Sequence, residues 1–338
     1  MIWDLFAFIL AATISILLTY VIRLISVRLS IVDVPAKYRW NSRATPTLGG
    51  VAISLSFAAS SIVMTPIMSD PRFVYMVIGL SVIFLCGLLD DISSLKPYVK
   101  LIIQIVASMT VLMGGIVLSI SGIYIVDATI TIIWIVGITN AFNLIDNMDG
   151  ICGGTAIVSA IVMAIHLVFL QDVGMVLVLA AFSGACLGFM FHNSRPASIF
   201  MGDCGSLSCG FIVSVAAIYV SAGYSNDPMT ASVVPILVLS IPIMDTAFVS
   251  FTRPIRGQSI ARGGKDHLSH RLVSLGMNER QVAFSMYGLG LAFGMISLMY
   301  QSNYIARSVP IVFVVLVLYS LLCTILFFTT PDLDKNEK

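Results

Sequence analysis

The sequence contains few charged residues. Only 10% of its 338 residues are Asp, Glu, Lys or Arg, whereas 58% are hydrophobic. This balance excludes an ordinary soluble domain and is typical of a protein that crosses a membrane many times, so the lipid bilayer is the first expected partner. The net charge of +1 offers nothing in favour of nucleic acid, and no nucleic-acid partner is expected.

Close cysteine pairs are absent as well. The six cysteines lie mostly in or beside apolar runs, and without a C-x-x-C pair they predict neither a zinc site nor a disulfide framework. The N-terminus, Met1 to Asp4, lacks the basic residues of a signal peptide, so the first apolar run is predicted to be a retained helix. No internal repeat and no separate soluble domain stand out, which predicts one integral membrane domain over residues 1–338.

Long apolar runs dominate what is present. A membrane-spanning helix needs about 20 apolar residues. By that measure the fold class is all-α, a polytopic bundle of about eleven transmembrane helices. The spans are predicted at 3–22, 47–68, 73–89, 99–120, 128–142, 151–170, 175–191, 207–223, 231–252, 282–301 and 309–329.

Positive charge is distributed unevenly over the connections between these spans. Of the 18 Lys and Arg residues, all but Arg72 and Arg307 fall on alternate connections and the C-terminal tail. Because cytoplasmic loops carry the excess of Lys and Arg, the N-terminus is predicted outside and the C-terminus in the cytoplasm. The longest such connection, residues 253–281, is then a cytoplasmic loop.

The stretch N-A-F-N-L-I-D-N-M-D-G carries four polar residues at steps of three: Asn140, Asn143, Asp146 and Asp149. At that spacing they lie along one side of a helix or of a turn that continues it. Amides and carboxylates at the end of a membrane helix are costly unless they bind something. The alternative is a hydrogen-bonded cluster between helices.

Three more acids are predicted on the cytoplasmic side, namely Asp90, Asp91 and Asp203. Like Asp146 and Asp149, each is expected at or just after the C-terminal end of a helix, where carboxylates are disfavoured without a counter-charge such as a divalent cation. Asp203 and Asp149 are the predicted Mg²⁺ ligands, with Mn²⁺ as the substitute ion, because magnesium takes one or two carboxylates plus phosphate oxygens.

Each of these acids also has a structural interpretation. Asp90 and Asp91 fit a solvated helix end as well as a metal or phosphate contact, and Asp203 fits a cap of the next helix. Lys100 begins the fourth span, where it fits either a phosphate contact or an anchor at the membrane surface.

The 253–281 loop contains a histidine motif, G-G-K-D-H-L-S-H-R. His267 and His270 lie among Arg262, Lys265 and Arg271, which makes a compact cationic cluster suited to a diphosphate. Without the carboxylates it would be a basic loop facing lipid headgroups.

Three further polar residues fall outside these motifs. His166 is interpreted as a hydrogen-bonded packing residue, and the role of His192 is left open. Asp245, an acid inside the ninth span, fits a functional residue and a structural partner of a nearby base equally well.

Taken together, T-P-T-L-G-G at 45–50, Asp90–Asp91, the Asn/Asp stretch, F-M-G-D-C-G-S at 200–206 and the histidine loop resemble the polyprenyl-phosphate N-acetylhexosamine-1-phosphate transferases, a superfamily within glycosyltransferase family 4. The motifs are highly specific together, though not singly, and follow the expected order over most of the chain. The resemblance implies a Mg²⁺-dependent enzyme that transfers sugar-1-phosphate from a UDP-sugar to undecaprenyl phosphate and releases UMP. Its site would face the cytoplasm at the inner (plasma) membrane, with a homodimer left open as the assembly.

The resemblance also implies roles. Asp203 and the Asn/Asp stretch, with Asn140 and Asn143 contacting substrate, would hold magnesium on the diphosphate. Asp90 and Asp91 would face the lipid phosphate, one of them as base. Asp146 would contact the uridine, and His267, His270 and Arg271 would bind the diphosphate. Lys100, Arg262 and Lys265 are the further predicted substrate-binding residues. Direct displacement is favoured over an aspartyl-phosphate route, which the residues leave open.

Two positions depart from the pattern. Ser269 stands where related enzymes of the GlcNAc type commonly have a histidine, and Asn147 stands where related motifs often have glycine. The triple-histidine pattern of the muramyl-peptide enzymes is absent, which favours UDP-GlcNAc as the donor. Two rival classes are an ion- or proton-coupled transporter and an intramembrane aspartyl protease. The first would need several acids near mid-bilayer, and the second would need neither the Asn/Asp stretch nor the cationic loop.

Overall fold

A computed structural model describes residues 2–34, 44–60, 70–224, 227–257, 264 and 266–301, together with 324, 325 and 328. Within these residues the fold is helical, apart from a two-stranded antiparallel pair, β1 (Val32–Asp33) and β2 (Thr45–Pro46). The helices are α1 (Ile2–Arg28), α2 (Gly49–Ser60), α3 (Pro71–Ser93), α4 (Pro97–Met113), α5 (Tyr124–Ile145), α6 (Ile151–Phe169), α7 (Val173–Asn193), α8 (Asp203–Gly223), α9 (Pro228–Val238), α10 (Ser240–Ile255), α11 (Leu268–Ser274) and α12 (Glu279–Gln301). The all-α expectation is confirmed in this part of the chain.

Seven of these helices are long and apolar enough to cross a membrane, and the α9–α10 pair makes an eighth if it counts as one broken span. The chain is therefore a multi-pass membrane protein. Two predicted spans, 47–68 and 99–120, correspond to the shorter apolar helices α2 and α4. The span predicted at 309–329 lies almost wholly outside the described residues, so the total of eleven stays a prediction.

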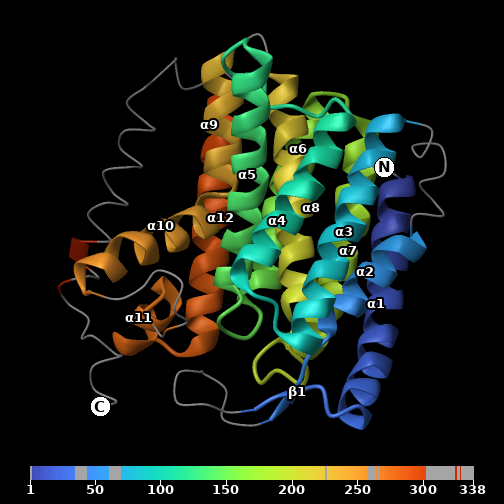
Figure 1. Ribbon diagram of the computed structural model, residues 1–338, viewed down its shortest axis with the longest axis vertical. Coiled ribbons are helices and arrows are strands. Elements are labelled where there is room, and N and C mark those ends of the chain that lie inside the picture. The colour runs from blue at the N-terminus through green and yellow to red at the C-terminus, as the bar shows by residue number, and fades with distance from the viewer. Residues whose placement is uncertain are drawn as a thin grey trace.

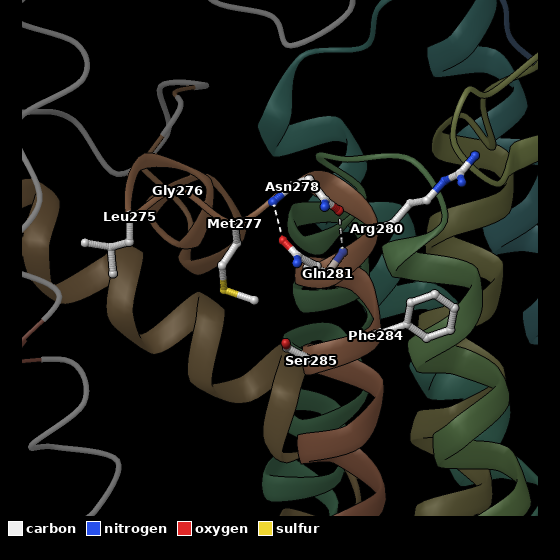
Figure 2. A pocket seen from close by; sticks show the side chains of 8 residues that line it. All are labelled: Leu275, Gly276, Met277, Asn278, Arg280, Gln281, Phe284 and Ser285. Carbon is white, nitrogen blue, oxygen red and sulfur yellow. Dashed lines mark hydrogen bonds between the residues drawn. The ribbon is translucent and has the colours of Figure 1, made fainter.

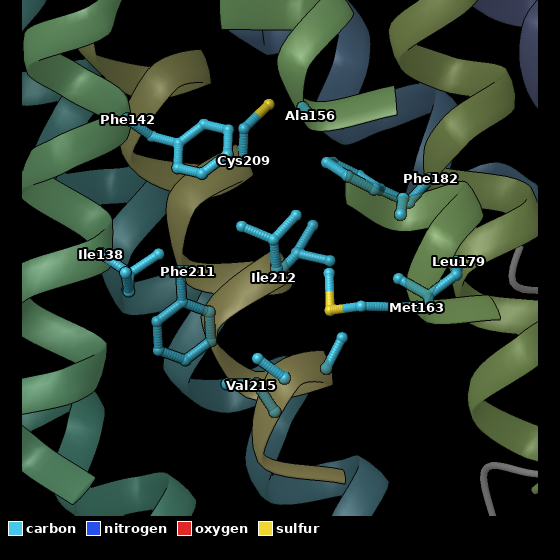
Figure 3. Close-up of a cluster of buried hydrophobic side chains, with 14 of the residues drawn as sticks. Ile138, Phe142, Ala156, Met163, Leu179, Phe182, Cys209, Phe211, Ile212 and Val215 are labelled. Atoms are coloured by element: carbon cyan, nitrogen blue, oxygen red, sulfur yellow. The ribbon is translucent and has the colours of Figure 1, made fainter. Parts of the chain in front are cut away.

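Helix α8 lies at the centre of the bundle and packs most extensively against α3, α5 and α6 (Figure 1). Its side chains Phe211, Ile212 and Val215 belong to a buried apolar cluster with side chains of α5, α6 and α7 (Figure 3). Small residues allow helix backbones to approach closely in a membrane. A Cβ atom at Gly210 would lie 2.7 Å from the Thr139 Cα, so α5 and α8 touch almost backbone to backbone.

The span predicted at 231–252 is broken, and this prediction of one continuous helix is wrong. α9 and α10 meet at an angle of 78° beside Leu239. Pro242 lacks the backbone N–H that would continue the α9 hydrogen-bond pattern, which explains a break at this point. α10 therefore runs sideways out of the bundle (Figure 1), with Asp245 and Arg253 buried and Phe251 exposed.

The segment before α2 is tied to the loop before α8. The Gly49 and Gly50 amides donate to the carbonyls of Phe200 and Met201, at 3.0 and 2.7 Å, and the Phe200 amide donates to the Pro46 carbonyl. A Cβ atom at Gly50 would lie 2.1 Å from the Gly205 amide nitrogen, so only glycine fits there. Two motifs about 150 residues apart in the sequence thereby form one wall at the end of the bundle where α8 begins.

Candidate functional site

Asp203 is the first residue of α8. The prediction that it follows a helix C-terminus is therefore wrong, and it stands where the helix dipole favours an acid. The helix end is capped by Asp91 of α3, whose carboxylate accepts from the Asp203 amide at 2.7 Å and the Cys204 amide at 3.0 Å. Gly202 has a φ of +73°, and a Cβ there would meet the Asp91 carboxylate at 2.7 Å. The two acidic motifs thus meet through this cap.

Lys100 of α4 connects the other carboxylates. Its Nζ lies 2.9 Å from Asp90 Oδ2 and 2.7 Å from Asp203 Oδ2. The second oxygen of Asp90 accepts from the Leu95 amide at 2.6 Å, which fixes the carboxylate across the α3–α4 connection. A cation therefore sits between two carboxylates that come from helices α3 and α8. We call Asp90, Asp91, Lys100, Asn143, Asp146 and Asp203 the acid cluster.

The two asparagines of the Asn/Asp stretch have different surroundings. Asn143 donates to Asp203 Oδ1 and to Ser206 Oγ, both at 3.0 Å, and so belongs to the acid cluster. Asn140 lies one turn away and exchanges hydrogen bonds with Gln104 of α4, at 2.6 and 3.2 Å. For Asn140 the structure shows the interhelical hydrogen-bonded cluster that was the alternative interpretation.

Asp146 follows the last residue of α5 and receives no such support. In the described part of the chain, no lysine or arginine forms an ion pair with it. Burial, together with the negative charges of Asp203, Asp91 and Asp149, raises its pKa to about 8. Even with Asp146 protonated, the carboxylates of Asp90, Asp91 and Asp203 outnumber the Lys100 ammonium within the acid cluster, which favours the binding of a cation.

We expect Asp146→Asn to stabilise the protein while removing activity. The carboxyl has a pKa of about 8 when folded and 3.8 by itself, so the folded state holds a proton that the unfolded state loses. Stability then falls as pH rises from about 4 to 8, and the substitution removes this loss. In detergent at pH 8, the melting temperature should rise by at least about 2 °C.

The matched control for this prediction is Asp127→Asn at the other end of α5. The Asp127 carboxylate accepts hydrogen bonds from the Ile120 and Ser121 amides and the Ser121 hydroxyl, so its loss should lower the melting temperature. An Asp146→Asn protein that melts below wild type at pH 8 would contradict the assignment.

Asp149 is held by partners that sequence reasoning missed. Its Oδ2 accepts from Arg195 Nη1 at 3.2 Å and from the Ala197 amide at 3.0 Å, and Arg195 also pairs with Glu279 at 2.5 Å. The pairing of Asp149 with Asp203 around one metal stays a prediction. The acid that shares a cation with Asp203 in the structure is Asp90. In the sequence Arg195 is an isolated base, because its partner Glu279 lies 84 positions further along the chain.

The histidine motif, whose residues 266–271 we call the histidine segment, is anchored to α10. Asp245 is fully buried and lies 2.7 Å from His267 Nδ1, and it also accepts from the Leu268 amide at 2.8 Å. The structure thus gives Asp245 a basic partner. Burial opposes the protonation of His267, but the Asp245 carboxylate outweighs it and raises the His267 pKa.

Two ionic residues, Arg253 of α10 and Arg271, also hold the histidine segment. Arg253 donates twice to Asp266, both at 2.7 Å, and although burial opposes it this pairing lowers the pKa of Asp266. Arg271 donates to the Asp266 carbonyl at 3.1 Å and lies over the Phe248 ring. Burial and the neighbouring His267 lower the pKa of His270 to about 4, so this imidazole is neutral at pH 7.

Ser269 and Asn147, the two residues that depart from the family pattern, contact each other. Ser269 Oγ donates to Asn147 Oδ1 at 2.7 Å, which joins the histidine segment to the turn that also carries Asp146. Arg262 and Lys265, both predicted to contact the diphosphate, lie outside the described residues. Of the predicted residues, the structure brings Asp90, Asp91, Lys100, Asn143 and Asp203 into direct contact. Through Asn147 it joins the histidine segment to the turn that follows α5.

One open hollow of about 780 Å³ lies where α11 leads into α12. It is lined by residues of that junction, including Met277, Asn278, Gln281 and Phe284 (Figure 2). Asn278 and Gln281 exchange hydrogen bonds between side chains and backbone amides, at 2.8 and 2.9 Å, which caps α12. No residue of the acid cluster lines this hollow, so the hollow is separate from the candidate site.

Comparison with known proteins adds the following. Residues 73–221 match the model of glycosyl transferase family 4. A putative glycosyltransferase of Streptomyces coelicolor is 32% identical over 290 residues, which is 83% of this chain and 67% of the relative. A probable undecaprenyl-phosphate N-acetylglucosaminyl 1-phosphate transferase of Bacillus subtilis is 29% identical over 94% of this chain and 91% of its own. A decaprenyl-phosphate N-acetylglucosaminephosphotransferase of Mycolicibacterium smegmatis is 27% identical over 82% and 77%.

Proposed function

Because the chain belongs to glycosyl transferase family 4, we propose that it transfers N-acetylhexosamine-1-phosphate from a UDP-sugar to undecaprenyl phosphate and releases UMP. UDP-GlcNAc is the favoured donor, in keeping with the N-acetylglucosamine phosphate transfer for which the B. subtilis and M. smegmatis relatives are named. The reaction takes place at the cytoplasmic face of the plasma membrane, as the first membrane step of an envelope polysaccharide.

The contact of Lys100 with Asp90 and Asp203 carries this proposal. An ammonium group within 2.9 Å of both carboxylates marks a place where positive charge is held between α3 and α8. Both substrates are anionic phosphates, and their approach to each other needs such charge. The lysine side chain is long and flexible, so its ammonium group could turn from the carboxylates to an incoming phosphate. A purely structural ion pair would not require this flexibility.

The residues also fit a magnesium ion. Among the described residues, no group of three or more His, Cys, Asp or Glu side chains is placed to hold a metal. Magnesium does not need one, because one or two carboxylates with phosphate oxygens and waters complete its shell. Asp203 would hold it, with Asp90 or the predicted Asp149 as the second carboxylate. When bound, Mg²⁺ would neutralise the diphosphate and make UMP a better leaving group.

The protein's own residues would position the two phosphates. Asn143 fixes the Asp203 carboxylate through its amide. His267, whose pKa Asp245 raises, and Arg271 would bring positive charge to the diphosphate of the UDP-sugar. An oxygen of the lipid phosphate attacks the β-phosphorus, a new P–O–P linkage forms, and the bond from the β-phosphorus to the UMP oxygen breaks. Direct displacement of this kind needs no covalent enzyme intermediate.

The alternative function, an ion- or proton-coupled transporter, gains no support from Asp245. That interpretation needs acids near mid-bilayer that take up and release an ion. Both oxygens of Asp245 are instead engaged in hydrogen bonds, one with His267 and the other with the Leu268 amide. Its place in α10 is explained by the histidine segment.

We expect purified protein to release UMP from UDP-GlcNAc only when undecaprenyl phosphate and Mg²⁺ are both present. EDTA should stop the release, and added Mg²⁺ should restore it, with Mn²⁺ as the next best ion. A panel of radiolabelled UDP-sugars then identifies the preferred sugar. Absence of UMP release with every UDP-HexNAc tested would refute the proposed function.

A further inference from the structure

Ser269 and Ser274 of α11 use their hydroxyls differently. Ser274, in the last turn, bonds the Arg271 carbonyl of its own helix at 2.7 Å, whereas Ser269, the second residue of the helix, has no preceding turn within it. Ser269 donates instead to Asn147, 122 positions away, at 2.7 Å, and its side chain is completely buried. A buried hydroxyl with one distant partner ties two segments together.

Asn147 is itself fixed on the other side. Its Nδ2 donates to the Leu144 carbonyl at 3.0 Å, one of the carbonyls freed where α5 ends. The amide plane is therefore held by α5, and its oxygen is a rigid acceptor for Ser269. The next residue of the histidine segment, His270, also lies near the Asn147 backbone, which acts to raise the pKa of its imidazole against the effect of burial. Two consecutive residues of α11 thus meet one asparagine.

The histidine segment has a second anchor, Asp245, which attaches it to a different part of the fold. Asp245 holds His267 and Leu268 against α10, which runs out of the bundle. Asn147, by contrast, is adjacent to Asp146 in the turn at the acid cluster. Asp245 therefore sets the shape of the segment, whereas Asn147 sets its distance from the carboxylates.

We propose that the hydrogen bond between Ser269 and Asn147, the Ser269–Asn147 bridge, positions the histidine segment over the acid cluster and thereby determines the affinity for the diphosphate of the UDP-sugar. Both are positioning residues, and the proposal rests on the transfer reaction proposed above. A segment held equally in the ground state and the transition state contributes uniform binding, so loss of the bridge raises KM and leaves kcat unchanged.

The test compares Ser269→Ala, Asn147→Ala and the double variant, with Ser274→Ala as the control that removes a hydroxyl bonded within α11. Ser269→Ala should raise KM for UDP-GlcNAc about tenfold and change kcat by less than about twofold, because it leaves a buried acceptor without its donor. The double variant should be no worse than Asn147→Ala alone. Ser274→Ala should match wild type.

A readout without turnover separates this inference from the proposed function. UDP added alone should raise the melting temperature, and Ser269→Ala should need about ten times more UDP for the same rise. If wild type neither responds to UDP nor releases UMP, the proposed function fails. The bridge is then judged by the melting temperatures of the four proteins without ligand, where coupled effects support it and additive effects overturn it.

Two results overturn the inference when wild type is active. One is a fall in kcat with KM unchanged in Ser269→Ala, and the other is effects of the two single variants on KM that multiply in the double variant. Should Asn147→Ala fail to fold, Ser269→Cys takes its place. The thiol is a weak donor of similar size, so its KM should lie between those of wild type and Ser269→Ala, and a wild-type KM would overturn the bridge.

Discussion

Replacing Asp203 with alanine is expected to reduce kcat about a thousandfold while the protein stays folded. Asp203 accepts hydrogen bonds from Lys100 and Asn143, so its loss removes the carboxylate on which α4, α5 and α8 converge. The fold should survive, because the α8 end is capped by Asp91 through backbone amides that the substitution leaves in place. UMP release by the purified variant, with the melting temperature as the fold check, measures both effects.

Cys204→Ala is the matched control, one residue further along α8. The thiol is fully buried, and its sulfur makes a long contact of 3.8 Å with the Met201 carbonyl. Its removal leaves a small cavity that costs about 1 kcal/mol of stability, and we expect turnover within about twofold of wild type. Loss of activity in this variant comparable to that in Asp203→Ala would mean that the turn itself, rather than the carboxylate, is what the reaction requires.

Asp245→Asn is expected to weaken UDP-sugar binding and to cost about 3 kcal/mol of stability. The asparagine offers one carbonyl oxygen to two donors, His267 and the Leu268 amide, that now have a carboxylate oxygen each. The His267 pKa, raised by Asp245 against the opposing effect of burial, should fall. Because a raised histidine pKa keeps the charge up to higher pH, the variant should lose kcat/KM at lower pH than wild type.

The pH profile of kcat/KM for UDP-GlcNAc measures this shift, and Asp172→Asn supplies the control. Asp172 caps α7 by accepting from the Met175 amide at 3.0 Å. Because asparagine caps a helix about as well as aspartate, its substitution should change stability little and should not move the profile. If the alkaline limb of Asp245→Asn coincides with that of wild type, Asp245 has a purely structural role and the charge on His267 is not used.

Local patterns account for much of the candidate site. The step-three spacing of Asn140 and Asn143 did place both amides along one side of α5, facing Gln104 of α4 and Asp203 of α8. The step-three spacing no longer predicts a shared face beyond Ile145, where α5 ends. Asp146 and Asp149 follow on a turn and have different surroundings. A period derived from helix geometry holds only as far as the helix does.

Contacts between segments far apart in the sequence could not be predicted from such local patterns. The sequence left Lys100 between a phosphate contact and a membrane anchor, and Asp245 between a functional acid and a structural partner. The structure gives each of them a partner from another part of the chain, Asp203 for Lys100 and His267 for Asp245. The broken ninth span followed the same rule, since Pro242 is visible in the sequence but the 78° angle depends on what α10 packs against.

The sequence by itself determined the helical class, the positions of the apolar runs and the residue types that gather at the site, because hydrophobic length and helical period are properties of neighbouring residues. Only the tertiary structure decided which carboxylate shares the Lys100 ammonium, which one caps α8, and that Asp149 is held by Arg195. Charge pairing acts over a few ångströms in space, and separation along the chain carries no information about that distance.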